Sequence, residues 1–235
     1  MSTIVKRGYS PKDETEFGKQ ALEKLHRAGE DLQYLLNRGY KIKGASEFVG
    51  NHFLLSERQR LALVRAVSSD ENVNRRKAKE IKMPSRGSVV HIDGFNTIIT
   101  LEVALSGSLL LKCMDGTIRD LAGLRGTYRL IDKTDTAITM IGRGLDSYQI
   151  GKVVFYLDAP VSNSGRLKQR IEELLHEFPF EVEVEVIHHV DSVLEKLDHV
   201  ITSDAIILDK CISWLNVNER IIEDILGGYP YLNFS

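Results

Sequence analysis

The fold expected of this chain is decided by the stretch Val89-Val90-His91-Ile92-Asp93-Gly94-Phe95-Asn96. Apolar residues run into a carboxylate, and a glycine turn and an amide follow, which is the pattern of a buried strand that ends at the edge of a sheet. About a hundred residues later, a second short apolar strand ends in an aspartate, in His199-Val200-Ile201-Thr202-Ser203-Asp204. Because ligands bind outside the carboxyl ends of parallel strands, these two strand ends predict a functional site.

The rest of the chain after residue 86 fits a parallel sheet. Strands are expected at about 88–93, 108–113, 152–157, 182–188 and 199–203. Helical stretches are expected at about 96–106, 117–144 in broken form, 164–177, 191–197 and 212–226. Strands that alternate with helices are typical of βαβ units around a parallel sheet. The strict alternation from Glu181 to Val186 predicts a strand with one wet face, near the edge of this sheet.

Four aspartates stand where strand carboxyl ends are expected, namely Asp93, Asp158, Asp191 and Asp204. A lone aspartate after a strand is usually a helix N-cap, and this interpretation applies to each of them singly. Four of them at one sheet edge would repel each other unless a cation is bound. Mg²⁺ or Mn²⁺ would turn them into a ligand set that activates water for displacement at phosphorus.

The first 86 residues carry helical signals only. Apolar residues recur at three- and four-residue steps between Phe17 and Leu35, and a short helix fits at 46–53. Ser56 with Gln59 predicts a capping box, and Ser69 caps a further helix. The helix after Ser56 is expected to bury three apolar side chains. They are Leu61, Val64 and Val67. We therefore predict a small α-helical domain at 1–86 and an α/β domain at 87–235.

The two predicted domains have opposite charge. Residues 1–86 contain 18 Lys and Arg against 11 Asp and Glu, whereas residues 87–235 contain 13 against 22. A basic domain beside an acidic one suits a protein that binds a polyanion with one part and a cation with the other. Two ordinary solvated surfaces would explain the difference in charge equally well. With two distant cysteines and no apolar run of membrane length, a cytoplasmic protein is expected, with no membrane partner.

The motifs around three of these aspartates, Val-His-Ile-Asp93-Gly-Phe-Asn96, His-Val-Asp191-Ser-Val-Leu and Val-Ile-Thr-Ser-Asp204, together resemble PIN-like nucleases, in particular their NYN branch. The resemblance spans roughly residues 88–220 and implies a three-layer α/β/α fold and metal-dependent cleavage of RNA. It further implies Asp93, Asp191 and Asp204 as metal ligands, with Asn96 positioning Asp93 or a phosphate. A further acid of these enzymes has no certain counterpart here; Asp158, Asp115 and Asp120 are the candidates. The second acid often found just after the last aspartate is missing.

Across its full length the chain also resembles an uncharacterised, largely archaeal family, domain of unknown function 434. This resemblance includes Tyr34-Leu-Leu-Asn-Arg-Gly-Tyr40 and Asp158-Ala-Pro-Val-Ser-Asn-Ser-Gly165. It brings no established activity with it.

Two further segments are candidates for phosphate binding. Ser162, Ser164 and Arg166 open a predicted helix whose first turn offers free N–H groups to an anion. Arg119 and Arg125 lie in a segment that is poor in apolar periodicity, where they are expected to line the cleft and contact a phosphate backbone. A capped helix with an exposed arginine explains the first segment, and ion pairs with local carboxylates explain the second.

The sequence therefore predicts a Mg²⁺- or Mn²⁺-dependent ribonuclease in which Asp93, Asp191, Asp204 and Asp158 hold metal. A non-catalytic RNA-binding protein with the same fold is the first alternative, because the late acid is missing. A small-molecule phosphohydrolase that uses the same carboxylates is the second. Whether the chain forms a homo-oligomer stays open.

Overall fold

The computed structural model describes residues 5–123 and 126–234. The N-terminal part is helical, as the sequence predicts. Its helices are α1 (Asp13–Glu16), α2 (Lys19–Asn37), α3 (Ile42–His52), α4 (Glu57–Ala66) and α5 (Asp70–Lys79). Among the described residues, no helix is both long enough and apolar enough to cross a membrane.

The start of α4 and of α5 follows the expected capping chemistry. Ser56 accepts a hydrogen bond from the backbone N–H of Gln59, whose side chain accepts one from the N–H of Ser56 in return, and Ser69 caps α5. The predicted burial of α4 is wrong in part: Leu61 and Val64 are 36% and 41% exposed. Helix α4 instead turns another stripe inward, which includes Leu63 and Ala66.

The α/β part contains a four-stranded parallel sheet with the order β5-β4-β1-β6. Helices cover both of its faces, as β4 illustrates. Phe155 belongs to a core cluster that includes residues of α6, α7, α8 and α11, and Tyr156 belongs to another that includes residues of α9 and α10. Strand β5 lies at one edge, as predicted. The strands of this sheet are β1 (Val89–Asp93), β4 (Lys152–Asp158), β5 (Glu181–Ile187) and β6 (Val200–Ile201), and the helices of this part are α6 (Gly94–Leu105), α7 (Thr134–Asp146), α8 (Ser164–Leu175), α9 (Val190–Leu194), α10 (Ala205–Lys210) and α11 (Val217–Leu226).

The order of the strands creates a switch point between β1 and β6. From β1 the chain moves outward to β4 and then to β5, and it returns to place β6 on the other side of β1. At such a reversal the connections on either side diverge and leave a crevice outside the carboxyl ends of the strands. Asp93 ends β1 and Asp204 follows β6, so both aspartates flank this crevice.

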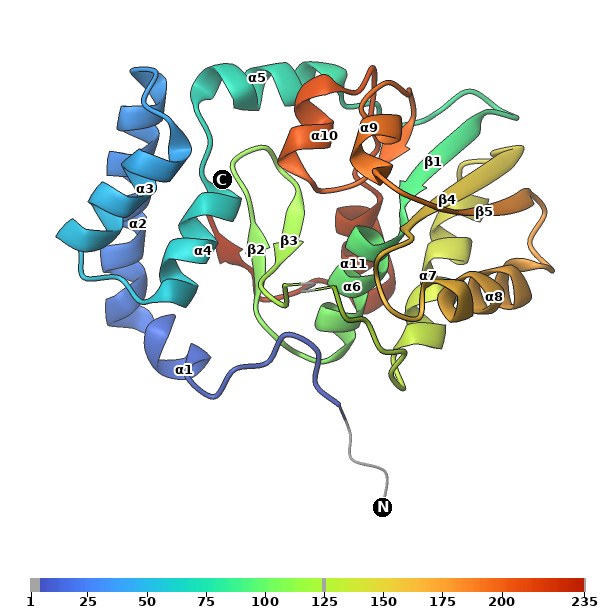
Figure 1. Ribbon diagram of the computed structural model, residues 1–235, viewed down its shortest axis with the longest axis horizontal. Helices are drawn as coiled ribbons and strands as arrows, with labels where there is room; N and C mark the ends of the chain where they lie inside the picture. Colours follow the sequence, from blue (N-terminus) through green and yellow to red (C-terminus); the bar gives the residue numbers. More distant parts are fainter. Residues whose placement is uncertain (1–4, 124–125, 235) are drawn as a thin grey trace.

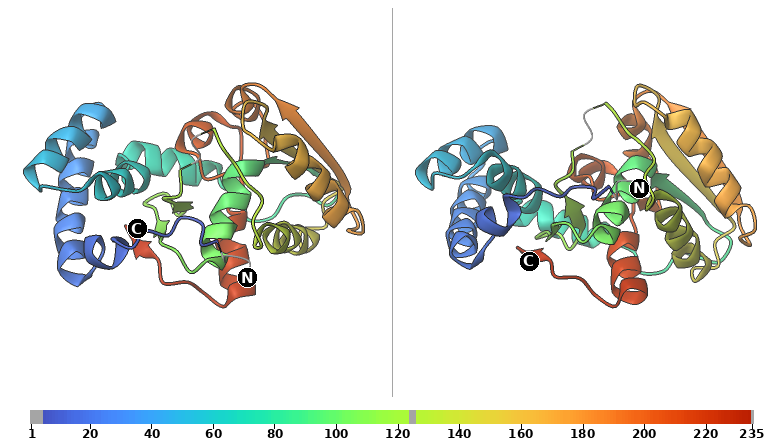
Figure 2. Two further views of the ribbon diagram at one scale, coloured as in Figure 1. Left: turned by 60° about the horizontal axis from the view of Figure 1, so that its bottom comes forward. Right: turned by 90° about the horizontal axis from the view of Figure 1, so that it is seen from below.

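A second, three-stranded sheet lies between the helical part and the parallel sheet (Figures 1 and 2). It consists of β2 (Leu110–Lys112), β3 (Ile118–Asp120) and β7 (Leu232–Asn233). The expected helical stretch at 117–144 is therefore wrong at its start, where β3 forms a hairpin with β2. The N-terminal helices share one core with this small sheet, since Leu25 and Leu32 cluster with Leu111, Cys113 and Phe234. The domain division at residue 86 stays a prediction.

Candidate functional site

A cavity of about 700 Å³ opens at the carboxyl edge of the parallel sheet. Asp93, Asp158, Asp191 and Asp204 all line it, together with Asn96. They come from four separate elements: the ends of β1 and β4, the first turn of α9, and the cap of α10. The fold thus brings together four carboxylates that lie up to 111 positions apart in the sequence.

Asp93 is the most enclosed of the four, at 9% exposure. One carboxylate oxygen caps α6 by accepting the backbone N–H of Asn96 at 3.4 Å, and the other accepts the hydroxyl of Thr202 at 2.9 Å. Burial, together with the negative charges of Asp204 and Asp191, raises the pKa of Asp93 to about 7. This carboxyl therefore ionises with difficulty unless positive charge is nearby.

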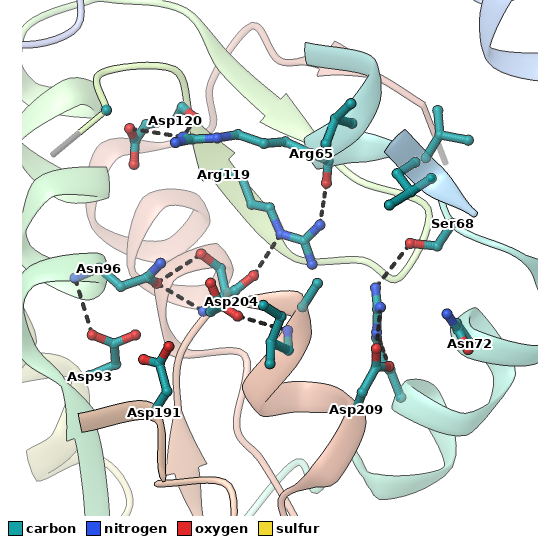
Figure 3. Close-up of a pocket in the computed structure, with 18 of the residues that line it drawn as sticks. Arg65, Ser68, Asn72, Asp93, Asn96, Arg119, Asp120, Asp191, Asp204 and Asp209 are labelled. Atoms are coloured by element: carbon teal, nitrogen blue, oxygen red, sulfur yellow. Dashed lines mark hydrogen bonds and ion pairs between the residues drawn. The ribbon is translucent and has the colours of Figure 1, made fainter. Parts of the chain in front are cut away.

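Asn96 connects the two strand ends that flank the switch point (Figure 3). Its side-chain oxygen accepts the backbone N–H of Ser203 at 2.9 Å and the Ser203 hydroxyl at 2.8 Å. Because Ser203 precedes Asp204 and Asn96 lies in the turn after Asp93, this side chain fixes the spacing between the two aspartates.

The other three aspartates are less enclosed than Asp93. Asp204 accepts the backbone N–H groups of Ile206 at 2.7 Å and Ile207 at 3.3 Å, at the start of α10. Partial burial raises the pKa of Asp191, and the charges of Asp204 and Asp158 add to this effect. Burial also raises the pKa of Asp158, against the lowering effect of a backbone hydrogen bond at the start of α9.

The four carboxylates differ from the neighbouring aspartates in their ion pairing. In the described part of the chain, no Lys, Arg or His side chain forms an ion pair with any of the four. Asp115, Asp120 and Asp209 lie close by, and each is paired with an arginine. The unpaired set of hard oxygen donors suits a divalent cation. Within residues 5–123 and 126–234, however, no three acidic, His or Cys side chains converge closely enough to form a complete metal site.

Arg119 lines the cavity, as predicted, and its side chain is engaged within the protein. The side chain is 7% exposed, and it donates from Nε to the carbonyl of Ser203 at 2.6 Å and from Nη2 to Asp115 at 2.6 Å. Its Nη1 donates to the carbonyl of Arg65. All three nitrogens thus have protein acceptors, and the alternative of a local ion pair is the one that the structure shows.

Arg65 also lines the cavity, although nothing in the sequence pattern singles it out among the basic residues of the helical part. It lies on α4, and its Nη1 donates to the backbone carbonyl of Asp120 and lies 3.5 Å from the Asp120 carboxylate. Asp120, one of the candidates for a further acid, lines the same cavity and accepts the hydroxyl of Thr100 at 3.0 Å. The sequence pattern cannot show that α4 packs beside the sheet edge, so Arg65 becomes visible only in the fold.

The remaining predicted phosphate contacts lie outside this cavity. Ser162, Ser164 and Arg166 are absent from its lining. Ser162 instead accepts the backbone N–H of Tyr128 at 3.0 Å, and Ser164 is buried at the start of α8. Arg166 is exposed on α8, and Arg125 lies outside the described residues.

The comparisons with known proteins match both parts of the chain. Residues 24–79 match the protein of unknown function (DUF434), which confirms that resemblance for the helical part, and residues 83–220 match the domain of unknown function (DUF5616). A protein of Methanocaldococcus jannaschii with the name "Uncharacterized protein MJ0935" is 39% identical over 186 residues, which are 78% of this chain and 88% of that protein. No solved structure matches the chain. Because the match over residues 83–220 covers more than half of the sequence, this chain belongs to the family of the domain of unknown function (DUF5616).

Proposed function

We propose that the chain is a divalent-metal-dependent ribonuclease with a PIN-like α/β/α domain. The observation that carries this proposal is the set of four carboxylates, Asp93, Asp158, Asp191 and Asp204, that line one cavity and have no arginine or lysine partner among the described residues. Of the four, Asp93 is buried. A buried carboxylate without positive charge is costly, and nearby like charges raise that cost, so a bound cation would account for this arrangement. The strand order 5-4-1-6, with two of the carboxylates at its switch point, supports the same interpretation.

The four carboxylates suit a Mg²⁺ or Mn²⁺ ion that keeps water ligands better than an ion fully enclosed by protein ligands. Mg²⁺ keeps several water ligands and is usually bound by one or two carboxylates together with substrate phosphates, which agrees with carboxylates that share a cavity without converging on one point. Asp93 and Asp204 are the proposed direct ligands, because Asn96 and Ser203 hold them in a fixed relation.

In the proposed reaction, the bound cation would polarise the phosphodiester and the attacking water. Asp93 and Asp204 would hold this cation, and Asp191 and Asp158 would contribute negative charge around it. Arg65, with a side chain that is 31% exposed, would donate to a phosphate oxygen on the helical side of the cavity.

The test is cleavage of 5′-labelled single-stranded and structured RNAs with Mg²⁺, Mn²⁺ or EDTA. Removing one carboxylate, in Asp93→Asn or Asp204→Asn, is expected to lower the cleavage rate by at least about a hundredfold, because loss of an outer-sphere partner alone costs 10- to 100-fold. Asp31→Asn, an exposed aspartate on α2, is the matched control and should cleave at the wild-type rate. Cleavage that persists in EDTA, or undiminished in both cavity variants, contradicts the proposal.

One observation favours a non-catalytic RNA-binding protein as the second candidate. Asp93 and Asp204 each cap a helix, and such capping alone explains an aspartate at the end of a strand. This candidate predicts RNA binding that is independent of divalent metal and survives Asp93→Asn. A small-molecule phosphohydrolase would instead hydrolyse nucleotide monophosphates and leave RNA intact.

A further inference from the structure

The cavity has a second wall that is apolar and comes from the N-terminal helices. Tyr40, Ile42 and Val64 line it and are 60%, 38% and 41% exposed. Tyr40 lies between α2 and α3, Ile42 begins α3, and Val64 lies on α4. Large apolar side chains that remain exposed and gather in one cavity indicate a binding surface. The unexpected exposure of Val64 thereby has a physical explanation.

This apolar wall continues to the acidic edge through one residue of α10. Ile206 is 58% exposed and also lines the cavity. The backbone N–H of Ile206 donates to Asp204 at 2.7 Å, so Ile206 lies directly beside a proposed metal ligand. A single ligand can therefore contact the apolar wall and the carboxylates at the same time.

Polar groups stand beside the apolar wall. Arg65 follows Val64 on α4, and within the described residues only its Nη1 has a protein acceptor, so Nε and Nη2 remain available to a ligand. Asn72 also lines the cavity; its side-chain oxygen accepts from Arg75 at 2.8 Å. The side-chain nitrogen Nδ2 of Asn72 donates to no acceptor in the described part of the chain, so it is available to donate to a ligand.

We propose that this wall, formed by Tyr40, Ile42, Val64 and Ile206, binds an unpaired nucleobase whose adjoining phosphate lies between Arg65 and the acidic edge. The inference rests on the proposed ribonuclease function and specifies its substrate. A nucleotide combines a flat apolar face, a polar base edge and an anionic phosphate within one small unit, which matches the three kinds of lining in this cavity. A volume of about 700 Å³ lies within the 300–1,000 Å³ that is usual for such ligands.

The same chemistry restricts the substrate to unpaired RNA at this position. A base stacked inside a duplex presents only its edges, whereas stacking on an aromatic side chain requires a splayed-out base. Stacking tolerates any base because each has a π-face. The subsite therefore selects single-stranded segments, loops or ends without reading their sequence.

The experiment measures binding separately from cleavage. Fluorescence anisotropy follows a 5′-fluorescein, unstructured RNA decamer of mixed sequence and an abasic decamer with the same backbone, in EDTA and in Ca²⁺. Tyr40→Ala is expected to weaken binding of the base-containing decamer about five- to tenfold, the lower part of the range for loss of one stacked base. Tyr40→Phe should restore it, because the ring face remains. Tyr34→Ala, which removes a tyrosine 57% exposed outside the cavity, is the matched control and should bind like the wild type.

Each outcome decides the inference. A loss in Tyr40→Ala that is confined to the base-containing decamer supports it. An equal loss for the abasic decamer, an equal loss in Tyr34→Ala, or no binding by the wild type in either buffer overturns it. Failure of the ribonuclease proposal would look different, because Tyr40-dependent binding would then persist without any metal-dependent cleavage.

Discussion

Arg76 and Asp209 form a bidentate ion pair across the junction between the helical part and the α/β part. Nε of Arg76 lies 2.7 Å from one carboxylate oxygen of Asp209, and Nη2 lies 2.9 Å from the other. Nη1 of the same guanidinium donates to Asp115 at 2.8 Å. Since Asp209 lies on α10, the helix that Asp204 caps, this pair connects α5 to the segment that positions a proposed metal ligand.

The first prediction concerns the stability that this pair provides. Arg76 is 3% exposed. Arg76→Ala leaves the carboxylate of Asp209 without its main partner and removes a hydrogen bond and a positive charge from the buried Asp115. We expect the free energy of unfolding to fall by about 3 kcal/mol, because removing one partner of a buried pair leaves an uncompensated charge. Arg75→Ala is the control: Arg75 pairs with the same Asp209 at 3.1 Å but is 41% exposed, so the loss should stay below about 1 kcal/mol. Urea unfolding measures both; equal losses would contradict a special role for Arg76.

The second prediction explains the glycine after Asp93. A Cβ on Gly94 would lie 2.6 Å from Leu157 Cδ2 and 3.1 Å from the backbone oxygen of Tyr156, so α6 must stay close to β4 at this point. Gly94→Ala should lower the free energy of unfolding by about 1–3 kcal/mol through overpacking. Gly165→Ala, at a helical position with nothing within 4 Å, should be neutral or stabilise the protein by up to about 1 kcal/mol. Thermal or urea unfolding compares the two, and a harmless Gly94→Ala would show that α6 can move.

The sequence pattern predicted those parts of the fold in which local signals are strong. The run into Asp93, the alternation from Glu181 to Val186, and the capping residues Ser56 and Ser69 each carry their own physical signature, and the structure places strands and helix starts there. The strand β3 was missed because three residues are too few to show a period. Helix α10 is not predicted either, because six residues are too few to show a period; its one local signal is Asp204 before Ala205.

The sequence predicts only the part of the site that lies at the carboxyl edge of the parallel sheet. Because the carboxyl ends of parallel strands share one edge, the sequence alone predicts that four aspartates, Asp93, Asp158, Asp191 and Asp204, lie together. Tyr40 lies between α2 and α3, and Arg65 lies on α4; the docking of these helices depends on the core that they share with the small sheet. No periodicity within α2 or α4 reveals which exposed residues face another part of the chain, so this wall required the structure.

The last prediction follows from the raised pKa of Asp93. In an unfolded chain this carboxyl titrates near pH 4, whereas in the folded protein its pKa is about 7. Between these two values the folded state binds a proton that the unfolded state has released, so the free energy of unfolding falls as the pH rises. This contribution is complete below about pH 4 and is lost once the pH exceeds about 7.

Urea unfolding in EDTA at pH 5, 6, 7 and 8 tests this for the wild type and Asp93→Asn. Groups other than Asp93 titrate in both proteins, so the difference between the two curves reports chiefly on this carboxyl. Relative to the variant, the wild type should lose about 1–3 kcal/mol between pH 5 and pH 8, the upper figure being that of two pKa units without screening by water in the cavity. Mn²⁺ bound beside an ionised Asp93 should reduce that loss, because the cation favours the charged carboxylate. Parallel pH profiles in EDTA would show that Asp93 is already ionised without metal and would remove the physical reason for a cation at this edge.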